Sequence, residues 1–266
     1  MTAAMAFGLR LTDLALSWTE KTPIRDQVVC PTLVLDFADF RYRLPIVGRT
    51  ATGKSTFLYA LACLKWPRRG GIDWVFPDGR ETVSFTTGAS GSMPPPHWHQ
   101  LRRDRFGFAF QNSALLPFLT VRENLGWPLR LRKMANPVIS DRVDQVLDAI
   151  TVPESDHRFL GDQYPNQLSG GQRQRVALGV AVISRPTILF ADEPTGHLDD
   201  DTRRRVMERV FGFLNIGSGQ SAVVWVTHHA DDVYLTEAPK RIRLVKSPGQ
   251  PATLGIENVP PARSWP

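Results

Sequence analysis

The sequence has few cysteines, no long apolar run and no recognisable leader segment. Cys30 and Cys63 are its two cysteines and stand in no CxxC pattern, which argues against a disulfide framework and against a zinc knuckle. No stretch approaches the roughly 18 consecutive apolar residues that span a bilayer. Residues 1–8 lack the basic start and the apolar core of a signal peptide. We therefore expect a cytoplasmic protein.

The rest of the composition is that of an ordinary globular protein. The 266 residues, 42% of them hydrophobic, suffice for one large domain or two closely joined lobes. The net charge of +6 could attract nucleic acid, an anionic membrane face or a nucleotide. Because the arginines are scattered along the chain, a solvated surface is the favoured interpretation of this charge.

The most informative stretch begins at Gly48 and has the pattern GxxxxGK[ST]. An apolar, strand-like run (residues 44–47) precedes it and a helical run (residues 57–62) follows, in the order that a phosphate-binding loop requires. In such a loop, backbone N–H groups and the helix start bind phosphates, the lysine reaches the β- and γ-phosphates, and the next hydroxyl binds Mg²⁺. The pattern predicts a nucleotide-phosphate site formed by Gly48, Arg49, Thr50, Ala51, Thr52, Gly53, Lys54, Ser55 and Thr56.

Two acids close a second apolar run, residues 187–191. Ligands bind at the ends of strands in sheets of this kind, so Asp192 is a candidate for Mg²⁺. Glu193 is placed to polarise a water for in-line attack on a γ-phosphate, the role of a general base. The alternative is that both acids only cap the turn before Pro194.

Further candidates stand at the ends of other predicted strands and helices. Gln111 ends an apolar strand, and a helix start supplies a second anion site at Ser169, Gly170, Gly171 and Gln172. Trp18 is consistent with stacking on a nucleotide base and equally with packing in a small core. His228 could donate to a γ-phosphate oxygen, although a lone histidine is more often a core residue.

The secondary-structure pattern predicts an α/β protein with a helical lobe between Gln111 and Ser169. The pattern predicts a helix that is broken at Pro128 over residues 119–131, and it predicts an amphipathic helix over residues 141–150. Residues 70–99 read as loop with short strands, so His97 and His99 are expected to be exposed loop residues rather than a metal pair.

Taken together, these segments resemble the ATP-binding subunit of an ABC transporter over most of residues 9–246. Gly48–Thr56 resembles the Walker A loop, Gln111 the Q-loop glutamine, residues 168–172 the LSGGQ signature, and residues 188–193 the Walker B strand with its glutamate. Asp199 stands at the D-loop position, His228 at that of the switch histidine, and Trp18 at that of a stacking tyrosine. The amino-acid sequence of residues 108–124 and 191–199 is most similar to that of the lipoprotein-releasing and macrolide-exporter type subfamily.

The resemblance implies a P-loop NTPase core with a mixed sheet, an N-terminal antiparallel β subdomain and a helical subdomain. The expected domain is residues 1–246, with the helical subdomain at about 112–170 and a proline-rich tail at 247–266. It also implies ATP and Mg²⁺ as ligands, Ser55, Gln111 and Asp192 around the metal, and Glu193, His228 and Gln111 in catalysis. Asp199 and the signature residues Ser169 to Gln172 would contact nucleotide.

The implied assembly is a head-to-tail dimer in which the signature of one copy closes over the γ-phosphate held by Lys54 of the other. An integral membrane permease is expected to dock near Gln111–Pro128, which would place the chain on the inner face of the membrane. The alternative is a soluble ABC ATPase acting on nucleic acid or ribosomes. Such proteins usually carry two cassettes or long insertions, and this chain has one cassette without such an insertion.

Overall fold

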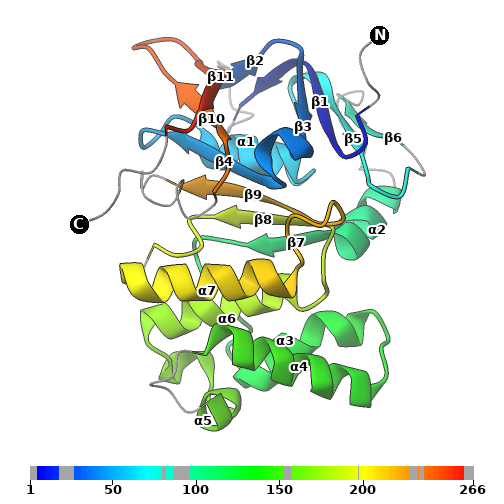
Figure 1. Ribbon diagram of the computed structural model, residues 1–266, viewed down its shortest axis with the longest axis vertical. Coiled ribbons are helices and arrows are strands. Elements are labelled where there is room, and N and C mark those ends of the chain that lie inside the picture. Colours follow the sequence, from blue (N-terminus) through cyan, green and yellow to red (C-terminus); the bar gives the residue numbers. More distant parts are fainter. Residues whose placement is uncertain are drawn as a thin grey trace. The chain divides into compact units, whose positions relative to one another are not determined.

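The computed structural model describes most of the chain, which divides into two units (Figure 1). The first unit comprises residues 1–104 and 217–266, and the second comprises residues 105–216. The described residues are 5–17, 27–79, 82–86, 96–151, 157–196, 198–227, 233 and 237–260.

A mixed sheet forms the framework of the first unit. Its strands run in the order β6-β5-β1-β2-β11-β10-β4-β9, and β3 pairs with β1. The N-terminal strands pair antiparallel, whereas β4 pairs parallel with both β9 and β10. The strands are β1 (Gly8–Leu16), β2 (Val28–Cys30), β3 (Leu33–Asp36), β4 (Arg43–Gly48), β5 (Arg69–Val75), β6 (Thr82–Thr86), β9 (Ala222–Thr227), β10 (Lys240–Val245) and β11 (Ala252–Asn258).

Two helices and a 3₁₀ turn accompany this sheet, namely α1 (Lys54–Leu61), α2 (Pro96–Arg105) and η1 (Phe37–Phe40). Strand β4 is buried because Leu44 and Ile46 are fully shielded from solvent. It leads through the phosphate loop into α1, whose Phe57 and Leu61 are also fully buried. The strand and the helix are thus both anchored in the core, and the loop between them has fixed ends.

The second unit consists of two parallel strands and a set of helices. Strand β7 (Phe106–Ala109) pairs with β8 (Ile188–Asp192), with Phe106 opposite Ile188. The helices are α3 (Val121–Leu131), α4 (Asn136–Ile150), α5 (His157–Asp162), α6 (Gly170–Val182) and α7 (Asp200–Phe213), with a 3₁₀ turn η2 (Pro165–Gln167). One apolar core joins α3, α4 and α6 through fully buried residues that include Val121, Leu125, Val146, Ile150 and Val176.

The predicted α/β fold with a mixed sheet, antiparallel N-terminal strands and a helical lobe is confirmed. The expected helical subdomain, about residues 112–170, falls inside the second unit, which also contains β7, β8, α6 and α7. Among the described residues, no helix combines the length and the hydropathy needed to cross a membrane.

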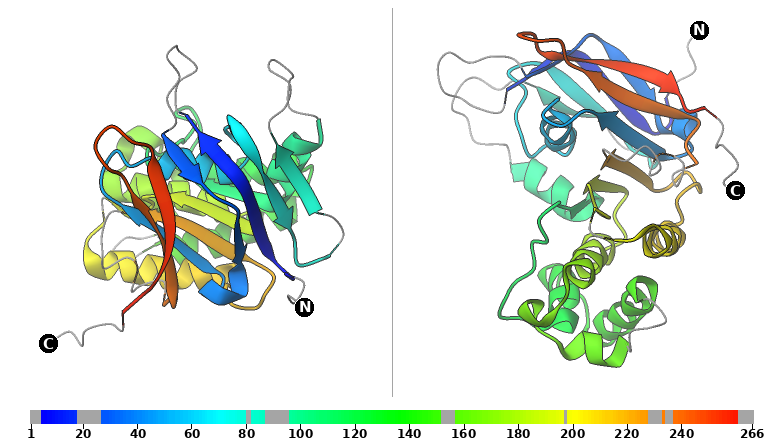
Figure 2. Two further views of the ribbon diagram at one scale, coloured as in Figure 1. Left: turned by 90° about the horizontal axis from the view of Figure 1, so that it is seen from above. Right: turned by 90° about the vertical axis from the view of Figure 1, so that its left-hand side faces the viewer.

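Three local predictions differ from the structure. Pro128 lies inside α3 without ending it, because Leu125 and Leu129 on either side are fully buried and hold the helix in place. Residues 96–99, expected to lie in a loop, form the start of α2, since buried Trp98 fixes this segment in the first unit. Residues 252–258, assigned to a tail from their proline-rich surroundings, form β11, which pairs with β10 as the second strand of a hairpin (Figure 2).

Candidate functional site

The phosphate loop between β4 and α1 depends on two glycines. A Cβ at Gly48 would lie 2.8 Å from Thr52 Oγ1 and 2.9 Å from the Leu244 carbonyl oxygen. Gly53, the N-cap of α1, has φ of 94°, and a Cβ there would lie 2.5 Å from Val28 Cγ2. Both positions therefore exclude larger residues, which explains the glycine spacing of the motif.

Lys54 closes the loop onto itself. Its ammonium group donates to the carbonyl oxygens of Gly48 (3.0 Å) and Arg49 (3.2 Å), and the side chain is 7% exposed. The Thr52 hydroxyl donates to the same Arg49 oxygen at 2.8 Å. The ammonium group is thus held at the centre of the loop, where it can donate to phosphate oxygens in place of these carbonyl oxygens.

Ala51 has a left-handed backbone conformation in the middle of this loop, with φ of 61°. The left-handed region costs an L-residue with a Cβ roughly 1–2 kcal/mol. The loop therefore contains a strained position as well as two glycines that relieve strain.

Gln27 supports the loop, and sequence reasoning missed it. Its side-chain oxygen accepts a hydrogen bond from the Thr56 hydroxyl at 3.0 Å. Thr56 is buried, so this bond satisfies a hydroxyl that the motif alone assigned to nucleotide. The two residues are 29 positions apart, and no local pattern links them.

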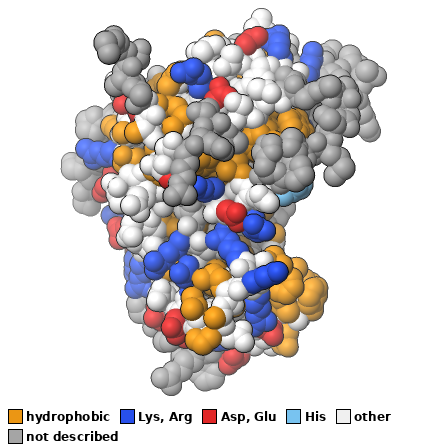
Figure 3. All heavy atoms as spheres, turned by 90° about the vertical axis from the view of Figure 1, so that its right-hand side faces the viewer, with side chains coloured by type: hydrophobic (Ala, Val, Ile, Leu, Met, Phe, Trp, Pro, Cys, Tyr) orange, Lys and Arg blue, Asp and Glu red, His pale blue; other side chains and the backbone are white. Residues whose placement is uncertain are grey.

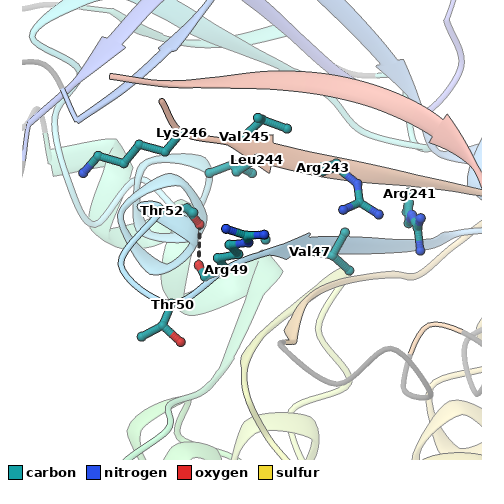
Figure 4. A pocket seen from close by; sticks show the side chains of 10 residues that line it. Val47, Arg49, Thr50, Thr52, Arg241, Arg243, Leu244, Val245 and Lys246 are labelled. Atoms are coloured by element: carbon teal, nitrogen blue, oxygen red, sulfur yellow. Dashed lines mark hydrogen bonds between the residues drawn. The ribbon is translucent and has the colours of Figure 1, made fainter. Parts of the chain in front are cut away.

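A pocket of about 940 Å³ borders the start of the loop (Figure 4). It is lined by Val47, Gly48, Arg49, Thr50 and Thr52 from the loop side and by Arg241, Arg243, Leu244, Val245 and Lys246 from the β10 side. Sequence reasoning also missed the cationic residues of β10.

Glu257 on β11 partly neutralises this pocket. Its carboxylate accepts hydrogen bonds from Arg243 Nε at 2.8 Å and Arg241 Nε at 3.2 Å. The hydrogen bond from Arg243 is the main cause that holds the pKa of Glu257 below its ordinary value, and Arg241 contributes to the same shift. With Arg49 and Lys246 also lining the pocket, cations outnumber this one carboxylate, and a polyanion is favoured there.

In the second unit, the carboxyl ends of β7 and β8 bring Gln111 and the two acids together. Gln111 Nε2 donates to Glu193 Oε2 at 3.2 Å, although the residues are 82 positions apart. Asp192, the last residue of β8, is 2% exposed. Glu193 follows it with φ of 49°, so the chain turns sharply after the buried carboxylate. The Glu193 carboxylate is thus hydrogen-bonded to an amide, and the neighbouring Asp192 carboxylate is buried.

The signature residues form the start of α6. The Ser169 hydroxyl accepts the Gln172 N–H at 3.2 Å, and the Gln172 side chain accepts the Ser169 N–H at 2.8 Å, which is a capping box. Gln174, 4% exposed in the next turn, donates to the Glu193 carbonyl at 3.0 Å. Helix α6 is therefore bonded directly to the residue after β8, and Gly170 and Gly171 occupy its first turn.

Asp199 is the N-cap of α7, where its carboxylate accepts the Thr202 N–H at 2.9 Å. This hydrogen bond lowers the pKa of Asp199 from its ordinary value. Asp199 thus has a structural role in this chain besides the role that the resemblance implies.

Two of the predicted site residues, Trp18 and His228, lie outside the described residues. Across the part of the chain that is described, no group of three or more His, Cys, Asp or Glu side chains is placed to hold a metal. A magnesium ion bound mainly by phosphate oxygens, water and one or two protein ligands is compatible with that finding.

Comparison with known proteins gives a consistent result. The family model described as "ABC transporter" matches residues 41–196, more than half of the chain. The chain is 35% identical over 201 residues to the uncharacterized ABC transporter ATP-binding protein MJ0796 of Methanocaldococcus jannaschii, a match that covers 76% of this chain and 78% of the relative. It is 36% identical to the lipoprotein-releasing system ATP-binding protein LolD of Aquifex aeolicus, over 72% of this chain and 77% of the relative.

A longer relative and two solved structures agree with this. The macrolide export ATP-binding/permease protein MacB of Syntrophobacter fumaroxidans is 36% identical over 74% of this chain, which corresponds to 25% of that protein. The dimeric structure of MJ0796, described as a bacterial ABC transporter cassette, has a TM-score of 0.70 and 28% identity and covers 88% of this chain and 93% of that one. A dimeric post-hydrolysis state of the same cassette, bound to ADP and Pi, matches equally well.

Proposed function

This chain belongs to the ABC transporter family as a subunit that binds and hydrolyses ATP, and we propose that it drives a membrane-embedded permease through cycles of dimerisation. Its fold is that of the ABC cassettes, and the family uses ATP with Mg²⁺.

The residues of the phosphate loop fit ATP and magnesium. The glycine positions leave space that a Cβ would fill, and Lys54 presents its charge on the loop carbonyls. The cationic residues of the adjoining pocket favour a triphosphate. By resemblance to the family, the Ser55 hydroxyl and the Asp192 carboxylate would be ligands of magnesium, and oxygens of these kinds are ligands that this ion prefers.

The observation that carries the proposal is the hydrogen bond from Gln111 to Glu193. The amide donor orients the carboxylate, and Glu193 would accept a proton from a water that attacks the γ-phosphate. The displaced β-phosphate oxygen leaves with ADP, and inorganic phosphate is the second product. Gln111 thereby positions the general base, and by resemblance it would also approach the metal.

The signature residues complete the site in a second copy of the chain. Ser169 and Gly170 are exposed at the start of α6, where backbone N–H groups favour an anion. Ser169 and Gly171 of one copy would close over the γ-phosphate held by Lys54 of the other, and Asp199 would lie near the same nucleotide. ATP would then join two copies, and hydrolysis would release them.

The permease would dock on the second unit near Gln111–Pro128. Figure 3 shows hydrophobic side chains on the surface of this unit, next to Lys and Arg side chains. Phe118 is 71% exposed and Trp127 is 42% exposed, and aromatic residues are enriched in protein–protein interfaces. The chain would thus lie on the inner face of the membrane through this partner.

Asn124 makes this surface rigid. The side chain is buried and accepts the Leu116 N–H at 2.8 Å, while its amide donates to the carbonyl oxygens of Leu119 (2.9 Å) and Thr120 (3.0 Å). These bonds hold the segment that carries Phe118 in one shape. A pre-formed surface of this kind supports docking of a helix from a partner.

The relatives are named as ABC transporter, lipoprotein-releasing and macrolide-export proteins, so the alternative of an ATPase that acts on nucleic acid or ribosomes is not favoured. We expect no salt-sensitive binding of DNA or RNA by this chain, measured by electrophoretic shift between low and high salt.

Glu193→Gln tests the catalytic assignment. The amide cannot accept the proton of the attacking water, so we expect Mg²⁺-dependent phosphate release to fall by roughly 10²–10⁴-fold. Size-exclusion chromatography with ATP should then show a trapped dimer. Lys54→Ala should lose nucleotide binding in an equilibrium titration and form no such dimer.

The matched control is Glu208→Gln, the same change at an exposed glutamate of α7. This variant should keep the turnover of the unmodified chain. Equal turnover of the Glu193→Gln and Glu208→Gln proteins would show that the proposed base is not the catalytic one.

Phe118→Ser tests the permease surface. We expect co-purification with membrane proteins from native membranes to fall sharply while basal ATP hydrolysis stays unchanged, because Phe118 is exposed and is not one of the residues assigned to the nucleotide site. Val34→Ser is the matched control, since Val34 is 48% exposed in the first unit. Loss of co-purification in both variants, or in neither, would argue against this surface.

A further inference from the structure

Helix α2 stands at one of the two places where the chain passes between the units. The first unit extends to Asp104, and the second begins at Arg105. Strand β7 follows α2 without an intervening loop, and Gln111 comes shortly after β7 ends at Ala109. Any displacement of α2 therefore reaches Gln111 through a short length of chain.

Arg102 ties this helix to the end of α1. Its Nη1 donates to the Cys63 carbonyl oxygen at 2.7 Å, and its Nη2 donates to His99 Nδ1 at 2.8 Å. Cys63 follows Ala62, the C-cap of α1, and has φ of 54°. A charged donor at a helix C-terminus is favoured, and a charge-assisted hydrogen bond is stronger than a neutral one.

Aromatic contacts support the same attachment. Trp98 of α2 is 2% exposed and packs edge-on against Phe85, with ring centroids 5.0 Å apart. Phe85 stacks on Trp66, in the segment just after α1, at 4.3 Å. Trp74 of β5 donates to the Leu61 carbonyl oxygen at 3.1 Å and anchors the same end of α1 to the sheet. The C-terminal end of α1 and helix α2 are therefore held together by polar and apolar contacts.

The opposite end of α1 is the phosphate loop. Helix α1 has eight residues and so is about 12 Å long, short enough to move as a rigid rod. A displacement of Lys54 on nucleotide binding would move Cys63 at the other end of this helix. The hydrogen bond from Arg102 to Cys63 would then move α2.

We propose that Arg102 is a positioning residue that couples the nucleotide at the phosphate loop to the placement of Gln111. The inference rests on the catalytic roles proposed above for Gln111 and Glu193. Arg102 contacts no nucleotide in this scheme and acts only through α2 and the chain that follows it.

Steady-state kinetics of Arg102→Gln separate positioning from binding. We expect kcat to fall about tenfold, because a small misplacement of a catalytic group is costly. The dissociation constant of a fluorescent ATP analogue should stay within about twofold, because the phosphate loop itself is unchanged. Arg102→Lys retains a charged donor for the Cys63 carbonyl and should recover kcat to within roughly threefold of the unmodified chain.

The matched control is Arg103→Ala. Arg103 neighbours Arg102 on α2, is 55% exposed and pairs with Asp104 at 2.8 Å. Its removal should leave kcat unchanged. An equal loss of kcat in Arg103→Ala and Arg102→Gln would overturn the proposal.

A double-mutant cycle with Gln111→Ala distinguishes coupling from general damage. If Arg102 acts through Gln111, Arg102→Gln should change kcat by less than about twofold in the Gln111→Ala background. Additive losses would refute the coupling. If Gln111→Ala and Glu193→Gln both keep full turnover, the proposed catalytic site is refuted. If these two variants lose turnover and Arg102→Gln keeps it, only the role of Arg102 is refuted.

Hydrogen exchange of the unmodified chain provides a measurement that needs no variant. Adding a non-hydrolysable ATP analogue should slow amide exchange in residues 98–105 as well as in the phosphate loop. Protection confined to the loop, with no change in α2, would contradict the inference even if the Arg102 variants failed to fold.

Discussion

Ala51→Gly should stabilise this protein, although Ala→Gly changes usually destabilise. Ala51 has φ of 61° in the phosphate loop, a conformation that an alanine adopts at a cost of roughly 1–2 kcal/mol. Glycine has no Cβ and adopts this conformation freely. The change therefore removes strain from the folded loop.

The size of the effect follows from two opposing contributions. Relief of the left-handed strain favours the variant by roughly 1–2 kcal/mol, and the extra freedom of glycine in the unfolded chain opposes it by about 0.4–1 kcal/mol. The net gain is about 0–1.6 kcal/mol in the free energy of unfolding, with a central value of about 0.8 kcal/mol. For a chain of this size, 1 kcal/mol corresponds to about 2 °C in Tm.

Differential scanning calorimetry without nucleotide measures this shift, and Ala60→Gly is the control. Ala60 is fully buried in the interior of α1, where glycine loses about 1 kcal/mol of helix propensity and about 0.8 kcal/mol of methyl burial. The same substitution should therefore raise Tm at residue 51 and lower it at residue 60. A lower Tm in both variants would show that Ala51 is not left-handed in solution, and the reasoning would fail.

Two further predictions concern the second unit. Gly179→Ala should lower the free energy of unfolding by up to about 2 kcal/mol in a denaturant titration, because the added Cβ would lie 2.9 Å from both Leu125 Cδ2 and Val146 Cγ1 in a buried core. The control is Gly212→Ala, where the added Cβ meets nothing within 4 Å, and this variant should raise the free energy of unfolding by about 1 kcal/mol. Tm should fall with pH below about 4.5, because the Thr120 N–H lowers the pKa of Glu123 in the folded state and this stabilisation is lost as the carboxylate protonates. Glu123→Gln, which keeps a capping acceptor without titrating, should show a shallower fall; an equal slope would contradict this origin.

The sequence by itself determined the parts of the site whose contacts are local. The phosphate loop closes on itself over a few residues, because Lys54 donates to the carbonyl oxygens of Gly48 and Arg49. The capping box of Ser169 and Gln172 also spans only one helical turn. Such contacts depend on backbone geometry within a few residues, so a motif is enough to predict them.

The tertiary structure alone decided which distant residues meet. Sheet pairing places Gln111 beside Glu193, Gln27 beside Thr56, and the arginines of β10 along the pocket of the phosphate loop. It also recruits residues 252–258 as a strand, because β10 supplies a partner that their own sequence does not reveal. Strand register and burial are properties of the whole sheet, and no short stretch of sequence contains them.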